Sequence, residues 1–108
     1  MDQFNAARHG DVALVTQLVN KQNVDEPDAR GCTVLHHASA RGHTHVMELL
    51  VGLGANVNVR DSDGWTPLHY AASALDGSVC SLFLDAGSVV DCLNNVGHTP
   101  LWFALWKD

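Results

Sequence analysis

Hydrophobic residues occur along this chain in short groups at helical spacing, separated by turn-forming polar residues. Val46, Leu49 and Leu50 stand at positions i, i+3 and i+4, and Leu68 and Ala71 are again three residues apart. Residues at this spacing share one face of an α-helix, so each group predicts a helix with one buried face. Helices of about 8 to 10 residues are unstable alone in water. We therefore expect their stability to come from packing on one another.

The residues that flank these groups are typical of helix ends. Thr66 is suited to cap a helix that begins at Pro67, because its hydroxyl can accept from a free backbone N–H and proline needs no donor in the first turn. Gly42 and Gly54 are placed to end two further helices. The segment 58–64 is dense in Asn, Asp, Ser and Gly, which predicts a tight turn.

The same pattern returns every 33 residues. Segment 31–38, GCTVLHHA, returns as GWTPLHYA at 64–71 and as GHTPLWFA at 97–104, and a slightly shorter copy precedes them. A fixed period of this length indicates stacked structural repeats. We divide the chain into units at approximately 1–30, 31–63 and 64–96 and a half unit at 97–108, which together form one domain.

The Thr-Pro-Leu-His-x-Ala run at 66–71, with its 33-residue period, resembles the ankyrin repeat, and the resemblance covers essentially the whole chain. It implies an all-α solenoid of stacked antiparallel helix pairs, with β-hairpin-like loops near 25–32, 58–65 and 91–98. It also implies that His36 and His69 are structural, bonded to Thr33 and Thr66 and to the adjacent loop. The expected core comprises Leu14, Leu18, Leu35, Ala38, Val46, Leu49, Leu50, Leu68, Ala71, Val79, Leu82, Phe83, Leu101 and Ala104.

The resemblance further implies a non-enzymatic module that binds another protein through a concave face built from loop tips and the first helix of each unit. Trp65 is a candidate hot spot, because Trp and Arg are frequent among residues that dominate binding energy. Packing of Trp65 against the neighbouring loop is the alternative. Matched position by position, the expected protein-binding residues are Arg8, His9, Arg30, Cys32, Arg41, Ser62, Asp63, Trp65, Asn95, His98 and Trp106.

Composition excludes several other functions. Among 108 residues there are 6 Lys and Arg against 12 Asp and Glu, a net charge of −6, which argues against nucleic acid and anionic membranes as partners. No apolar run approaches the roughly 20 residues of a spanning helix. Three scattered cysteines and the lack of a signal-peptide pattern predict an intracellular protein, cytoplasmic or nuclear.

The sequence predicts no catalytic residue, cofactor or metal site. The closest histidine clusters are His43 with His45 and the adjacent pair 36–37, but no cysteine or carboxylate stands at a ligand-like spacing to complete a tetrahedral set. Segment 61–64 lacks the further ligands of a calcium loop and is interpreted as a hairpin tip. A histidine-based metal protein remains a weaker alternative.

Two further alternatives concern the ends and loops of the stack. The half unit carries apolar residues, including Trp102 and Trp106, where a polar cap is expected. We expect that the natural chain continues, or that 97–108 either frays or packs against a second chain by self-association. A longer multidomain protein in which the stack serves as spacer or anchor is a separate alternative. The resemblance also makes Asn58 a candidate for hydroxylation, against a structural role in its loop.

Overall fold

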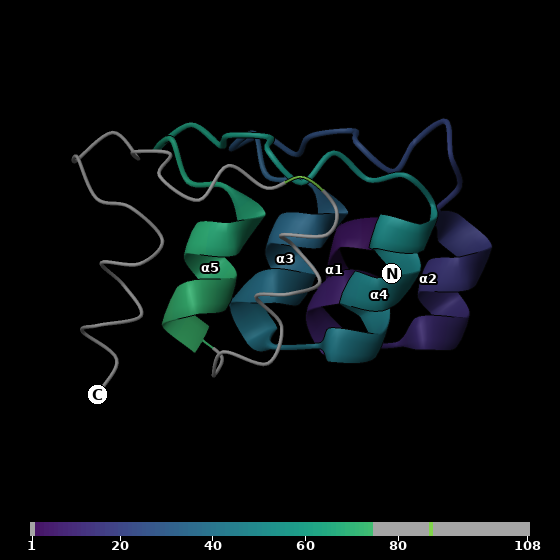
Figure 1. Cartoon of the computed structure of the whole chain (residues 1–108). Coiled ribbons are helices and arrows are strands. Elements are labelled where there is room, and N and C mark those ends of the chain that lie inside the picture. The colour runs from purple at the N-terminus through teal and green to yellow at the C-terminus, as the bar shows by residue number, and fades with distance from the viewer. Residues whose placement is uncertain (1, 75–86, 88–108) are drawn as a thin grey trace.

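The computed structural model describes residues 2–74 and 87, and this part of the chain consists of helices and loops. The helices are α1 (Gln3–His9), α2 (Val12–Leu18), α3 (Val34–Arg41), α4 (Thr44–Gly52) and α5 (Pro67–Ala74) (Figure 1). They form two complete helix pairs and the first helix of a third. The expected all-α architecture is confirmed.

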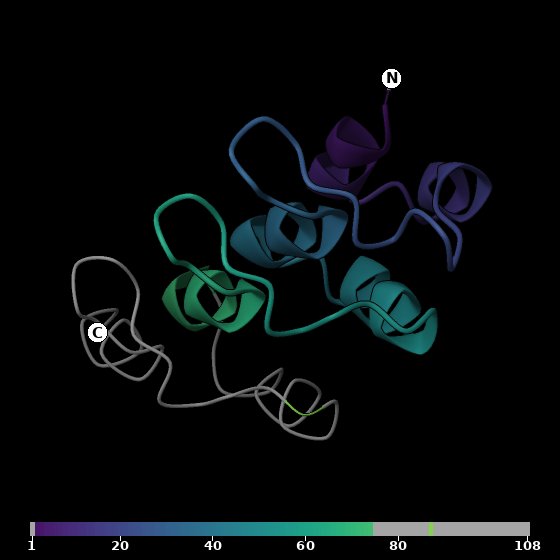
Figure 2. The ribbon, with the colours of Figure 1, turned by 90° about the horizontal axis from the view of Figure 1, so that it is seen from above.

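The helices stand in two rows. In the first row α3 packs between α1 and α5, and in the second row α2 packs against α4 (Figure 2). The loops that connect one pair to the next lie at one end of the helices and extend past the first row. This arrangement places the loop tips on the same side of the stack as α1, α3 and α5.

Local sequence explains where each helix begins and ends. The Asp2 and Asp11 carboxylates cap α1 and α2 by accepting from the backbone N–H groups three residues on, at 2.9 and 3.0 Å. The α5 helix begins at Pro67, directly after Thr66, as its sequence predicts. Gly10 and Gly42 end α1 and α3 with φ angles of 73° and 72°, a conformation that glycine adopts without a steric cost. The predicted cap and Gly42 are therefore confirmed.

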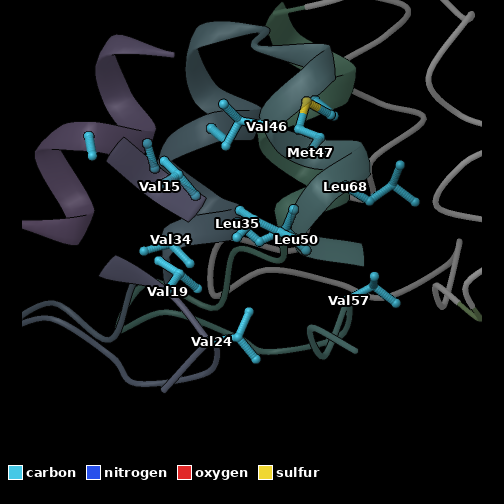
Figure 3. Close-up of a cluster of buried hydrophobic side chains, with 14 residues drawn as sticks. Val15, Val19, Val24, Val34, Leu35, Val46, Met47, Leu50, Val57 and Leu68 are labelled. Carbon is cyan, nitrogen blue, oxygen red and sulfur yellow. The ribbon is translucent and has the colours of Figure 1, made fainter. Parts of the chain in front are cut away.

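The core lies between the two rows (Figure 3). Six predicted core residues within the described part are buried: Leu35, Ala38, Val46, Leu50, Leu68 and Ala71. The assignment of Leu14 and Leu18 to the buried core was wrong in detail, because Val15 in α2 and Val19 at its C-cap are the buried residues, and both leucines are only partly buried against the core. Leu49 is likewise partly buried, whereas Met47 is fully enclosed.

The two described inter-unit loops are hairpin-like, as predicted. The Asp28 N–H donates to the Cys32 carbonyl at 2.9 Å, and the Asp61 N–H donates to the Trp65 carbonyl at 2.9 Å. The loop predicted at 91–98 lies outside the described residues. So do the predicted core residues Val79, Leu82, Phe83, Leu101 and Ala104 and the whole half unit 97–108. None of the helices in the described part is long and apolar enough to cross a bilayer.

Candidate functional site

A concavity of about 440 Å³ lies between the two hairpins and the first row of helices. Five of the predicted binding residues line it, which brings together positions from two successive units: Arg8, Arg30, Cys32, Ser62 and Asp63. The other lining residues are Asp28, Ala29, His36, His37, Ala40, Asp61 and Tyr70. The walls therefore combine carboxylates, guanidinium groups and imidazole rings with small apolar patches.

Each hairpin is built around one aspartate. Oδ1 of Asp28 accepts from the backbone N–H groups of residues 30 and 32 at 2.9 and 3.0 Å, while Oδ2 lies 2.8 Å from His37 Nε2. Oδ1 of Asp61 accepts from the N–H groups of residues 63 and 65, both at 2.9 Å, and Oδ2 accepts from the Tyr70 hydroxyl. The two networks are one repeat apart, so the same device braces both hairpins against their own helices.

Three hydrogen bonds join the first hairpin and α3 to the second hairpin. The Ser62 N–H donates to the carbonyl of residue 30 at 2.8 Å, and the Cys32 thiol donates to Asp61 Oδ2 at 3.5 Å. His36 Nε2 lies 2.9 Å from the Trp65 carbonyl and donates to it. The two hairpins are consequently held side by side, and the concavity between them has a defined width.

The surroundings of Cys32, Tyr70 and Asp28 shift the pKa values of their side chains. Burial, together with the carboxylates of Asp61 and Asp28, raises the pKa of the Cys32 thiol to about 11, so the thiol is protonated at neutral pH. Burial and the bond to Asp61 raise the pKa of Tyr70 well above its usual range. Burial by itself raises the pKa of Asp28, but hydrogen bonds from His37 and two backbone N–H groups outweigh it and bring the pKa below its ordinary value.

The motif histidines have the structural role that the resemblance implies. The backbone N–H of Thr33 donates to His36 Nδ1 at 3.0 Å, and Thr66 N–H donates to His69 Nδ1 at 3.1 Å. Burial lowers the pKa of His36, in keeping with a neutral ring that accepts through Nδ1 and donates through Nε2. His43 is structural as well, since its Nε2 donates to the Arg8 carbonyl at 2.7 Å. The rings of His36 and His43 link successive units.

The remaining predicted residues lie away from the walls of the concavity or outside the described part. His9 bonds within its own helix, with Nδ1 2.7 Å from the Asn5 carbonyl. Arg41 is exposed at the end of α3. The Trp65 ring packs on Tyr70 of α5, with ring centres 4.9 Å apart. Three predicted binding residues lie outside the described residues: Asn95, His98 and Trp106.

The structure brings a carboxylate and a cysteine close to a histidine, which their spacing along the chain did not predict. Ligand atoms of Asp28, Cys32 and His37 all lie within 4.8 Å of one another. Spacing along the chain did not reveal this group, because the fold of the hairpin back onto α3 creates it. Asp28 and His37 recur in register as Asp61 and Tyr70, 33 residues later, and that periodicity was the signal by which the two aspartates could have been found.

A comparison with protein families covers residues 4–108. The family model "Ankyrin repeats (3 copies)" matches residues 4–91 and, in an overlapping match, residues 53–108. A human protein, "Ankyrin repeat domain-containing protein 39" from Homo sapiens, is similar to 48% of this chain, with 41% identity over 53 residues. The matched segment spans only 29% of that protein's length.

Proposed function

Because the chain belongs to the ankyrin-repeat family, whose members are generally protein–protein interaction modules, we propose that it binds a protein partner through the concavity between its hairpins and α1, α3 and α5. The observation that carries this proposal is the convergence of five sequence-predicted binding residues on that one concavity. A repeat stack offers its partner a surface that is continuous across units, since each unit contributes the same positions.

The polar character of this surface favours a folded or extended protein segment over a small apolar ligand. Arg30 and Asp63 are exposed at the tips of neighbouring hairpins and carry opposite charges. Arg8, Asp28 and Asp61 supply further charges deeper in the concavity. Complementary charges on a partner would steer its approach and fix its register, and charge pairs in the buried centre would slow its release.

Site-specific photo-crosslinking tests which face meets the partner. A photoreactive amino acid replaces Ser62, on a hairpin tip, or Glu48, an exposed residue of α4 in the second row, as the matched control. We expect a specific crosslinked protein from position 62 and none, or unspecific products only, from position 48. Crosslinks to the same protein mainly from position 48 would place the interface on the opposite face and contradict the proposal.

The alternatives lead to different expectations. The proposal includes a non-enzymatic role in the cytoplasm or nucleus, and binding a protein partner requires no catalytic residue. A spacer or anchor role within a longer protein is the second candidate, since the chain matches only part of its human relative. In that case substitutions on the hairpin tips would leave all interactions of the full-length protein unchanged.

A further inference from the structure

We propose that Asp28, Cys32 and His37 form a binding site for a zinc ion on the wall of the concavity. The three side chains offer one oxygen, one sulfur and one nitrogen ligand, and the ligand atoms lie within 4.8 Å of one another. Zinc accepts this combination, whereas calcium and magnesium require sets of oxygen ligands. Metal binding at this site does not require the proposed protein partner.

The distances fit a metal with little movement. With zinc bonds of about 2.0 to 2.1 Å to oxygen and nitrogen, tetrahedral geometry separates those two ligand atoms by about 3.3 Å. The present separation of Asp28 Oδ2 and His37 Nε2 is 2.8 Å. A zinc ion would therefore replace the proton that these two atoms share. With a zinc–sulfur bond of about 2.3 Å, the sulfur would lie about 3.5 Å from the other two ligand atoms, and the three ligand atoms now lie within 4.8 Å of one another.

The surrounding structure orients the carboxylate and the ring. Two backbone N–H groups hold Oδ1 of Asp28 at 2.9 and 3.0 Å and leave Oδ2 directed at His37. The Phe4 ring packs against the His37 ring with centres 5.6 Å apart. Partners that hold ligands in place in this manner commonly strengthen metal binding by about 10- to 100-fold. Because all three ligands line the concavity, the ion has access from solvent.

Binding converts the Cys32 thiol into a thiolate and releases its proton to the buffer, without any redox change. The three protein ligands leave one tetrahedral position for water or for a group from a partner. Arg8 opposes the ion, because its Nη2 lies 3.3 Å from His37 Nδ1 and donates to that atom. When Nε2 binds a metal, Nδ1 must carry the proton, so two donors would then face each other.

Cobalt(II) provides the spectroscopic probe, since a cobalt–thiolate bond gives a near-ultraviolet absorption band that zinc abolishes when it displaces cobalt. We expect this band to saturate at one equivalent in the reduced wild-type protein. Cys32→Ser should lose it. Cys80→Ser and Cys92→Ser, which remove the other two thiols of the sequence, are the matched controls and should keep it.

Two further variants test the site if circular dichroism shows that Cys32→Ser does not fold. His37→Gln should weaken cobalt and zinc binding by at least about tenfold, because it removes a ligand, whereas His45→Gln on exposed His45 should not. Arg8→Gln should tighten binding by about threefold to tenfold, because it removes a like charge and a competing donor. Absence of the band in wild-type protein, its persistence in Cys32→Ser, or unchanged affinity in His37→Gln would overturn the proposal.

Discussion

Removal of the Asp61 side chain should destabilise the stack more than any other single change on the hairpins. Its carboxylate accepts four hydrogen bonds, from two hairpin N–H groups, the Cys32 thiol and the Tyr70 hydroxyl, and the residue is only 8% exposed. A hydrogen bond to a charged group contributes about 1.5–3 kcal/mol. Water can replace the carboxylate at the two N–H groups of the hairpin tip, so we count chiefly the two side-chain donors. Asp61→Ala should therefore cost about 3–5 kcal/mol.

The assay is urea unfolding followed by far-ultraviolet circular dichroism. Asp63→Ala, on the exposed neighbour two residues away, is the matched control and should change the unfolding free energy by less than about 0.5 kcal/mol. Asp61→Asn should cost nearly as much as Asp61→Ala, because its amide oxygen replaces the carboxylate only at the two N–H groups and its NH₂ cannot accept from Cys32 or Tyr70. A loss below about 1 kcal/mol in Asp61→Ala would refute the reasoning.

Three further predictions follow from the helices and their turns. Gly10→Ala should destabilise the protein by more than about 1 kcal/mol, because φ at Gly10 is 73° and a Cβ there would lie 2.5 Å from His43 Nδ1. Gly52→Ala should stabilise it by about 0.5–1 kcal/mol, because Gly52 is helical and has open space around it. Thermal unfolding compares the two variants. Ser39→Ala should stabilise by up to about 1 kcal/mol, because Ser39 Oγ is buried without a hydrogen-bond partner among the described residues; unchanged or lower stability in urea would contradict this. The free energy of unfolding should fall as pH drops below about 6.5, because burial lowers the pKa of His36, so that only the unfolded chain takes up a proton there. In His36→Gln, the urea midpoint should depend less on pH than in the wild-type protein.

The helices, their caps and the hairpins were predictable because they depend on local sequence within one repeat. A glycine at the end of a helix or a proline at its start acts through its own backbone, so Gly42 and Pro67 indicated the correct boundaries. The orientation of α2 was harder to predict from the sequence. Leu14 and Val15 are both apolar, and packing against the neighbouring helices decides which of the two side chains faces inward.

The candidate site was predictable in outline and not in its chemistry. Arg30 and Asp63 could be placed on hairpin tips from the repeat register alone. The approach of Asp28 to His37 and of Cys32 to Asp61 depends instead on how each hairpin folds back on its own helix and against the next hairpin. Contacts of this kind are set by tertiary geometry, which spacing along the chain does not contain.

The most direct test of the central claim compares how substitutions on the two opposite faces of the stack change its affinity for the partner. With the crosslinked partner purified, isothermal titration calorimetry compares wild-type protein with Arg30→Ala plus Asp63→Ala on the hairpin tips and with Glu48→Ala on α4, each first checked for an unchanged circular dichroism spectrum. A binding module that uses its concavity should lose at least about tenfold in affinity, or about 1.4 kcal/mol, in the hairpin variant and nothing in the α4 variant. Equal affinity of the wild-type protein and the hairpin variant would contradict the claim.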